Sequence, residues 1–238
     1  MDRLRPRLFN IDYWPLRAIG ASLEEFLSIY GNRLRGTTAV DFGASKAPYE
    51  PRLAEAGIKL LLADIGDVPT GTLKISDDGR VPLDDNSVDL VLSTQVLEHV
   101  PNVTGYLAEA LRIVKPGGLF FLSTHGTWHL HRYPHDMRRW TTDGLKYDVE
   151  QAGFQVESSK PYIGRLATCT YQRMAAYSEA IRPIRLLNPL RAAINAVGNL
   201  RMGVEEFFTT QAGREALQQI VVVTAIKPER RGDARGAE

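Results

Sequence analysis

Short apolar runs alternate with stretches of helical periodicity along most of the 238-residue chain. The apolar runs predict strands at 38–41, 58–63, 72–75, 87–93, 119–123, 154–158 and 219–225. The helical patterns predict helices at 48–56, 102–114 and 141–152, the last one started by Thr141 or Thr142 and ended by Gly153. Strands that alternate with helices in this way predict an α/β fold built from strand–helix–strand units.

The two ends of the chain differ from this alternating part. The N-terminal region is rich in arginine, aromatic residues and proline, and we expect Ser22 to begin a short helix there that reaches Tyr30. The C-terminal residues are polar and are expected to be disordered. The expected regions are a cap at 1–36, a domain at 37–228 and a tail at 229–238.

A mostly helical insertion at 161–213, broken by Pro183 and Pro189, separates the last two predicted strands. Seven basic residues lie between 160 and 203 against one acidic residue, Glu179. The simplest interpretation is a solvated helical face. The alternative is a basic amphipathic surface that touches anionic lipid or a phosphorylated substrate.

The composition describes an ordinary soluble domain, with 44% hydrophobic and 24% charged residues. A formal net charge of +1 does not suggest nucleic acid as a partner. The single cysteine, Cys169, excludes an internal disulfide, and no apolar run approaches the ~20 residues that span a bilayer. We therefore expect a cytoplasmic protein, while the sequence does not indicate its oligomeric state.

The chemistry-bearing pattern begins where the first predicted strand ends. Asp41 follows the apolar run, and Gly43 permits a tight turn with close backbone approach. Dinucleotide sites use the same strand–turn–helix order, but they keep several glycines and hold a pyrophosphate, which the Asp41 carboxylate would repel. Ala44-Ser45-Lys46 stands where further glycines would be needed. The turn therefore favours a cationic nucleoside over a nicotinamide dinucleotide.

Four further motifs follow this turn in one order. They are Asp64 after the second strand, Val81–Val91 (VPLDDNSVDLV), Val96–Val100 (VLEHV) and Leu111–Gly118 (LRIVKPGG). In this order the motifs resemble those of the class I S-adenosylmethionine-dependent methyltransferases of the methyltransferase-11 type, over about residues 37–160. The resemblance implies a Rossmann-like, mostly parallel seven-stranded sheet with helices on both faces and a helical insertion before the last strand.

The same resemblance implies S-adenosyl-L-methionine as the cofactor. Asp64 would accept hydrogen bonds from the ribose hydroxyls, a task that suits a carboxylate because it only accepts. Asp78, or Asp77 by a shift of one residue, would meet the adenine edge. The cofactor-binding positions carried over are Asp41, Gly43, Ala44, Asp64, Ile65, Asp78, Gly79, Ser93, Thr94 and Gln95. The departure at Ala44-Ser45-Lys46 keeps a non-catalytic relative as an alternative.

Four of the five histidines lie between 125 and 135, just after the fifth predicted strand. The segment 133–141 resembles a recurring family segment, which we interpret as a substrate-facing lid. The candidate general bases are His99, His125 and His135, and the candidate substrate contacts are Trp128, Tyr133, Arg138, Arg139 and Trp140.

No metal site is expected. His131 and His135 have helical spacing, but Pro134 makes one shared helical face improbable, and no cysteine or dense acidic cluster accompanies them. The sequence therefore leads to methyl transfer onto a small-molecule acceptor, with the hydroxyl oxygen of a sugar, a polyketide-like or a quinone-like compound favoured by analogy. A non-catalytic cofactor-binding or scaffold protein is the alternative.

Overall fold

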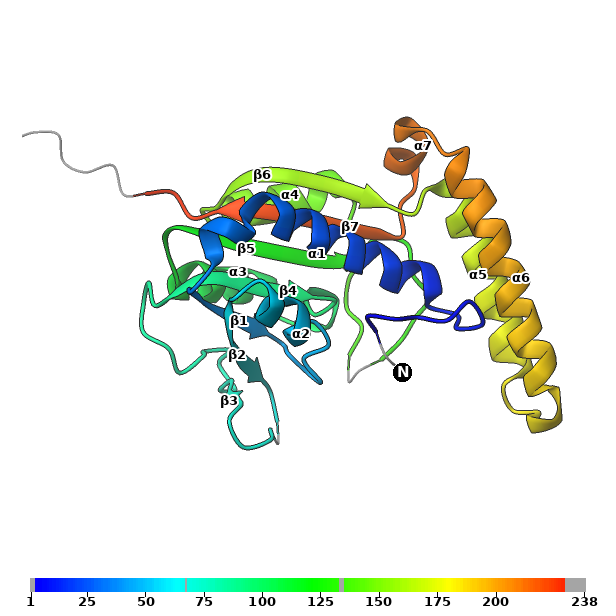
Figure 1. Ribbon diagram of the computed structural model, residues 1–238, viewed down its shortest axis with the longest axis horizontal. Helices are drawn as coiled ribbons and strands as arrows, with labels where there is room; N and C mark the ends of the chain where they lie inside the picture. Colours follow the sequence, from blue (N-terminus) through cyan, green and yellow to red (C-terminus); the bar gives the residue numbers. More distant parts are fainter. Residues whose placement is uncertain (1–2, 67, 133–134, 230–238) are drawn as a thin grey trace, which may run out of the picture.

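One seven-stranded sheet, ordered β3-β2-β1-β4-β5-β7-β6, organises the computed structural model (Figure 1). The structure describes residues 3–66, 68–132 and 135–229. The strands are β1 (Thr38–Phe42), β2 (Lys59–Asp64), β3 (Leu73–Lys74), β4 (Val88–Thr94), β5 (Val114–His125), β6 (Gln155–Tyr162) and β7 (Ile220–Ile226). Only β7 runs antiparallel to its neighbours β5 and β6. The predicted Rossmann-like α/β fold is confirmed.

Helices cover both faces of the sheet, as the sequence predicted. They are α1 (Tyr13–Leu34), α2 (Glu50–Glu55), α3 (Val103–Ile113), α4 (Thr142–Gln151), α5 (Arg165–Ile181), α6 (Asn188–Phe207) and α7 (Gln211–Ala216), with short 3₁₀ helices η1 (Leu97–His99) and η2 (Arg185–Leu187). Side-chain oxygens cap three of them: Asn102 accepts from the Gly105 amide at α3, Thr141 from the Gly144 amide at α4, and Thr210 from the Gly213 amide at α7.

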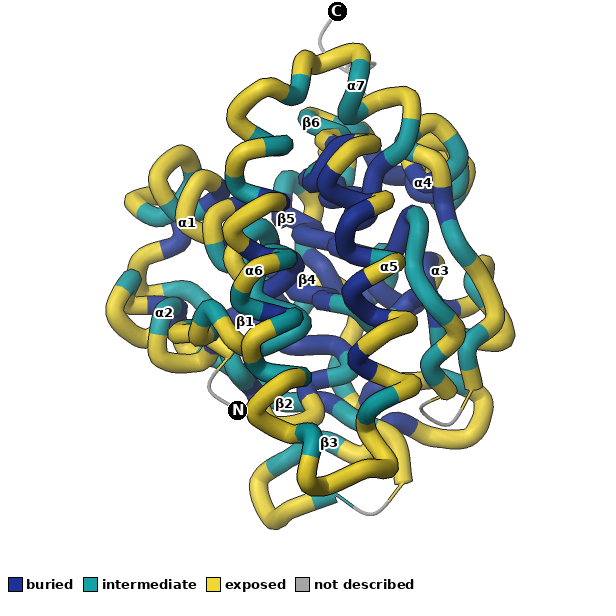
Figure 2. The backbone as a smooth tube through the Cα atoms, turned by 90° about the vertical axis from the view of Figure 1, so that its right-hand side faces the viewer, coloured by how far each residue is buried: buried dark blue, intermediate teal, exposed yellow. Residues whose placement is uncertain are grey.

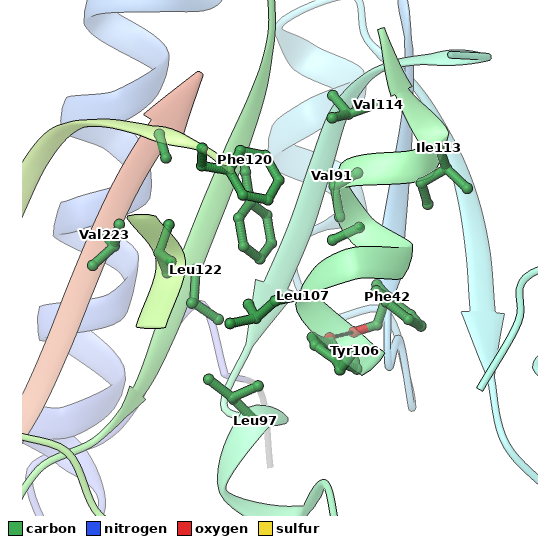
Figure 3. Packing of buried hydrophobic residues seen from close by; sticks show 14 of the residues in the cluster. Phe42, Val91, Leu97, Tyr106, Leu107, Ile113, Val114, Phe120, Leu122 and Val223 are labelled. Atoms are coloured by element: carbon green, nitrogen blue, oxygen red, sulfur yellow. Dashed lines mark hydrogen bonds between the residues drawn. The ribbon is translucent and has the colours of Figure 1, made fainter. Parts of the chain in front are cut away.

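Strand alternation divides the core between the two faces. Val40 and Phe42 point to one face, where they pack in a cluster with residues of α3 and α4 (Figure 3). Ala39 points to the other face, where Leu23 and Phe26 of α1 lie in the second cluster. Because both faces are covered, the central strands carry almost unbroken apolar runs.

The N-terminal helix differs from its prediction. It begins at Tyr13 rather than at Ser22 and continues to Leu34. Ser22 lies buried inside the helix, where its hydroxyl donates to the Ile19 carbonyl, so it does not cap the helix. The apolar spacing of Ile19, Leu23 and Phe26 passes across Ser22 without interruption, because these residues share the face that packs on the sheet.

The insertion lies at one end of the sheet, where α5 and α6 stand side by side (Figures 1 and 2). Its helices join β6 to β7, and a third cluster around Tyr171, Met174 and Met202 packs against Trp14 of α1 and Trp128. None of the helices in the described residues is long and apolar enough to cross a membrane. The region boundaries expected from the sequence stay predictions, and residues 230–238 of the expected tail lie outside the described residues.

Candidate cofactor and acceptor site

The candidate site lies where β1 and β4 meet in the middle of the sheet. From β1 the chain proceeds through β2 and β3 toward one edge, whereas β4 and β5 lie on the other side. Open α/β sheets bind ligands at such a reversal, outside the carboxyl ends of the strands. Asp41 near the end of β1 and Ser93 near the end of β4 stand at this position.

Asp41 is buried, and neither of its carboxylate oxygens has a hydrogen-bond partner among the described residues. Burial, reinforced by the nearby charge of Asp64, raises the pKa of Asp41 to about 7. A buried and unpaired carboxylate is costly, so it indicates a position that is completed by a cationic or hydrogen-bonding ligand.

Gly43 turns the chain immediately after this carboxylate. Its φ of +95° suits glycine, and a Cβ there would lie 2.6 Å from a methyl carbon of Val96. Gly43 therefore fits for two reasons: the turn needs a positive φ, and Val96 occupies the space that a side chain would need. The following residues depart from the family pattern, yet Ser45 still adopts the left-handed conformation with a φ of 49°. The turn keeps a glycine-like backbone where the glycine is missing.

Asp64, at the end of β2, is held toward the same turn. One of its oxygens accepts from the Ser45 amide at 2.6 Å, and the other accepts from the amide of Ile65 at 2.8 Å. The Ile65 side chain is exposed. Because the β1 and β2 turns meet through this carboxylate, Ser45 and Asp64, which are 19 positions apart in the sequence, lie together.

Asp78 and Gly79 lie in a surface turn beyond β3. The Asp78 carboxylate accepts from the Ser76 hydroxyl at 2.5 Å, a bond that lowers its pKa. Asp78 and Gly79 also line a surface pocket with Arg80 and Arg112. The turn conformation accounts for Asp78 locally, and its contact with adenine stays a prediction.

The end of β4 is fixed by a tyrosine that sequence reasoning missed. The Tyr106 hydroxyl of α3 donates to the Phe42 carbonyl at 2.7 Å and lies 2.8 Å from the Ser93 hydroxyl. Its ring stacks on that of Phe42, with the ring centroids 4.1 Å apart. Beyond Thr94, Gln95 has a φ of 56° and donates to the Ser123 hydroxyl. These contacts hold the turn that was expected to face the sulfonium end.

A carboxylate and a histidine lie together next to this turn. Glu98 is fully buried, and one of its oxygens accepts from the Thr124 hydroxyl at 2.7 Å. The other lies 3.3 Å from Nε2 of His125. Burial raises the pKa of Glu98 and lowers the pKa of His125 well below 6.5. Burial therefore favours the neutral form of the His125 imidazole.

Aromatic rings surround His125. The Trp128 ring stacks on the imidazole with the centroids 4.2 Å apart, and Tyr171 of α5 lies 4.8 Å from Trp128. His129 stands 6.0 Å from the Tyr171 ring. Tyr171 had no signal in the sequence, because it comes from the insertion, more than 40 residues after Trp128. The insertion therefore contributes a wall to this site.

Comparison with known proteins supports the methyltransferase interpretation. Residues 52–122 match the family profile described as a methyltransferase domain, of the methyltransferase-11 type. This match, together with a probable S-adenosylmethionine-dependent methyltransferase of Mycolicibacterium smegmatis that is 25% identical over 66% of this chain and 65% of the relative, supports the class I methyltransferase expected from the sequence. Its cofactor, S-adenosyl-L-methionine, is the one expected from the sequence.

Two relatives show how much of each protein the sequence similarity covers. The chain is 28% identical to a biotin biosynthesis bifunctional protein BioHC of Cellvibrio japonicus, over 70% of this chain and 38% of the relative. It is 31% identical to a ubiquinone biosynthesis O-methyltransferase of Paramagnetospirillum magneticum, over 37% of this chain and 41% of the relative. The chain thus spans about two fifths of the length of these relatives.

The fold of this methyltransferase domain also matches solved structures. The crystal structure of the [4+2]-cyclase SpnF covers 88% of this chain and 81% of its own, with a TM-score of 0.57 and 19% sequence identity. At this level of identity the likeness concerns the fold alone.

The described residues expected to form a substrate-facing lid bind other parts of the protein. Arg138 donates to the carbonyls of Val100 and Pro101, and Arg139 pairs with Asp136, so both guanidinium groups bind the protein itself. Trp140 is buried in the core cluster and its indole donates to Asp148, so its contact with a substrate stays a prediction. Tyr133 lies outside the described residues.

The histidines of this region also have different surroundings. His135 is exposed, and its carbonyl lies 2.5 Å from Nδ1 of His99. Ligand atoms of Glu98, His99 and His131 lie within 4.8 Å of one another, a set that could accept a cation. The helical pair considered from the sequence, His131 and His135, is not the grouping that the fold makes among the described residues. That no metal is used stays a prediction.

Proposed function

We propose that this domain transfers the methyl group of S-adenosylmethionine to the hydroxyl oxygen of a small-molecule acceptor. The observation that carries the proposal is the Asp41 carboxylate, buried without a hydrogen-bond partner at the carboxyl end of β1. In a family that uses a sulfonium cofactor, such a group is suited to a cation.

The residues present fit that cofactor. The unpaired Asp41 carboxylate favours a cation, and Gly43 lets the ligand approach the backbone, since a side chain there would meet Val96. Asp64 offers carboxylate oxygens to the ribose hydroxyls, and Asp78 is the candidate for the adenine edge. When bound, S-adenosylmethionine supplies a methyl group on a positively charged sulfur, which an oxygen nucleophile can attack.

The protein must orient the acceptor and remove its proton. Among the three candidate bases, His125 has the environment that suits this task best. With a proton on Nε2 facing Glu98, its Nδ1 remains as the acceptor, and Nδ1 has no hydrogen-bond partner among the described residues. In the proposed reaction the bound cofactor would supply the methyl group to the acceptor oxygen, and Nδ1 of His125 would take the hydroxyl proton.

The surroundings of His125 favour an apolar or aromatic acceptor. The rings of Trp128 and Tyr171 offer flat apolar surface beside the imidazole. One relative is named as an O-methyltransferase of ubiquinone biosynthesis, which supports oxygen as the acceptor atom and a quinone-like ring among the three acceptor types considered. Arg138 and Arg139 are occupied by protein partners, so we assign them to holding the loop.

A non-catalytic role is the second candidate. Ala44-Ser45-Lys46 departs from the glycine pattern of the family. The left-handed backbone of Ser45 favours a turn that can still bind the cofactor. The discriminating experiment incubates the purified protein with S-adenosylmethionine and cell extract and measures the release of S-adenosylhomocysteine. Cofactor binding without any release would favour the non-catalytic role.

The same assay tests the bases. His125→Ala is expected to lower turnover at least ~100-fold, while the affinity for S-adenosylhomocysteine, measured by calorimetry, changes little. His135→Ala serves as the comparison, because this side chain is exposed. Unchanged turnover in both variants would remove them as bases.

A further inference from the structure

The two long helices of the insertion form a hairpin with a well-packed inner side. Tyr171, Met174 and Met202 are buried between the helices and the body of the domain. Gly198 packs so closely that a Cβ there would lie 2.6 Å from the sulfur of Met174. On α6 the inner positions include Asn195 and Asn199, which are buried. The hairpin is therefore a fixed part of the fold.

The outer side of the hairpin is exposed (Figure 2), and it carries large apolar side chains. The large side chains on it are Tyr177, Ile184, Leu186, Leu190, Val197, Leu200, Val204, Phe207 and Phe208, which we call the hairpin surface. Leu186 at the tip is 88% exposed and Phe207 is 82% exposed. Along α6 the positions 190, 197, 200, 204 and 207 follow helical spacing and form one stripe opposite the buried asparagines.

The hairpin surface is bordered by positive charge. Between 165 and 208 the chain has six arginines, at 165, 173, 182, 185, 191 and 201, against three glutamates, at 179, 205 and 206, so this segment has a formal charge of +3. Of these arginines, only Arg201 forms an ion pair within the described residues, with Glu205. Since the whole chain has a formal net charge of only +1, the positive charge is concentrated here.

We propose that the hairpin surface docks on an anionic phospholipid bilayer. Exposed leucine, isoleucine and phenylalanine side chains can enter the boundary between headgroups and acyl chains, while the flanking arginines bind the anionic headgroups. A second copy of this chain is a poorer occupant, because pairing of the two hairpin tips would place Arg182, Arg185 and Arg191 of both copies close together.

The hairpin also forms part of the candidate acceptor site. Tyr171 lies on α5, and its ring contacts Trp128 beside His125. Docking of the hairpin would therefore hold one wall of the acceptor site close to the bilayer. This geometry assigns an amphipathic acceptor that partitions into lipid. That assignment rests on the proposed methyl transfer, whereas bilayer binding does not.

Flotation of the full-length protein with vesicles tests the docking, with no cofactor or acceptor present. Binding is expected with phosphatidylcholine vesicles that contain about 30% phosphatidylglycerol, and it should fall with added salt and be absent with phosphatidylcholine alone. The double variant Ile184→Glu, Leu186→Glu should bind at least ~10-fold more weakly. Ile29→Glu is the matched control, since Ile29 on α1 is 63% exposed and lies outside the hairpin surface.

Calorimetry with S-adenosylhomocysteine shows whether each variant remains folded. Equal flotation of the tip variant and the wild type, or no flotation of the wild type with anionic vesicles, would overturn the proposal. So would a dimer in light scattering that the tip variant abolishes, since it would assign the surface to a second copy. Methyl transfer that fails in the extract assay leaves the flotation result intact and removes only the acceptor assignment.

Discussion

At the scale of single residues, Asp41 and Gly43 have surroundings that indicate a bound ligand. Asp41 loses the hydration of its charge on burial and gains no hydrogen bond in return among the described residues. Its neighbour Gly43 avoids both the backbone strain and the contact with Val96 that a larger residue would meet. Together they describe a position that favours positive charge close to the backbone.

Cofactor binding is expected to depend on pH through Asp41. Its pKa of about 7 in the ligand-free protein falls when a cation binds, because the cation stabilises the carboxylate. The affinity for S-adenosylmethionine should therefore rise between pH 6 and pH 8 by about tenfold and then level off. Calorimetry across this range measures it, and Asp41→Asn should bind weakly and lose the dependence.

The stability of the ligand-free protein should show the opposite trend. The folded-state pKa of Asp41, about 7, lies above the ordinary value of 3.8, so the folded form holds a proton that the unfolded chain releases. Stability is then lost as pH rises from about 4 to about 7, by an amount on the order of 4 kcal/mol. Thermal unfolding of Asp41→Asn should lack this part of the decline. A wild-type decline of the same size in the variant would contradict the assignment.

Sequence reasoning reached the residues that carry a motif and missed those that meet only in space. Asp41, Gly43 and Asp64 sit at strand ends, so their order predicted their shared edge. Tyr171 comes from a helix far along the chain, and nothing near it in the sequence signals Trp128. Trp140 was expected at the substrate because it lies in the lid segment, and with its burial in the core cluster that contact stays a prediction.

At the scale of elements, α6 fastens the N-terminal segment to the domain. The Asn199 side-chain amide donates to the carbonyls of Leu8 and Asn10, and its backbone carbonyl accepts from the Trp14 indole. Asn195 adds a bond to the Phe9 carbonyl. The sequence predicted the helical insertion and a cap before the core, but it could not reveal that buried asparagines join the two.

Replacing Asn199 should loosen this attachment. Asn199→Ala leaves the carbonyls of Leu8 and Asn10 without their donor, at a cost of about 2 kcal/mol. Hydrogen exchange should accelerate in the N-terminal segment, and the free energy of unfolding should fall by that amount. Asn32→Ala is the control, because Asn32 is exposed on α1 and should change neither measurement. Equal exchange in both variants would show that the bonds do not hold the segment.

At the scale of the whole molecule, the insertion leaves and rejoins the sheet at neighbouring strand ends. β6 and β7 pair antiparallel, with Tyr162 opposite Ile220, so the two ends of the insertion lie next to each other. The sequence predicted β6 and β7 as strands at 154–158 and 219–225, but it did not predict that the two strands pair. A long excursion between adjacent strand ends is well tolerated, because loop-closure entropy grows slowly with length.

Removal of the insertion should therefore spare the sheet. A variant in which a short glycine and asparagine loop replaces residues 164–217 is expected to keep its circular dichroism in the strand region and to bind S-adenosylhomocysteine within about tenfold of the wild type. It should lose vesicle binding and turnover, since Tyr171 and the hairpin surface go with it. Loss of cofactor binding would show that the insertion supports the sheet as well.

The place of β7 also bears on how the protein is made. This strand lies between β5 and β6, yet it is the last strand that the ribosome delivers. Until it arrives, β5 exposes an unpaired edge and β6 has no strand to join, so the nascent chain carries an open template for aggregation. Completion of the sheet therefore waits for residues 220–226, and the domain is expected to depend on chaperone protection during synthesis.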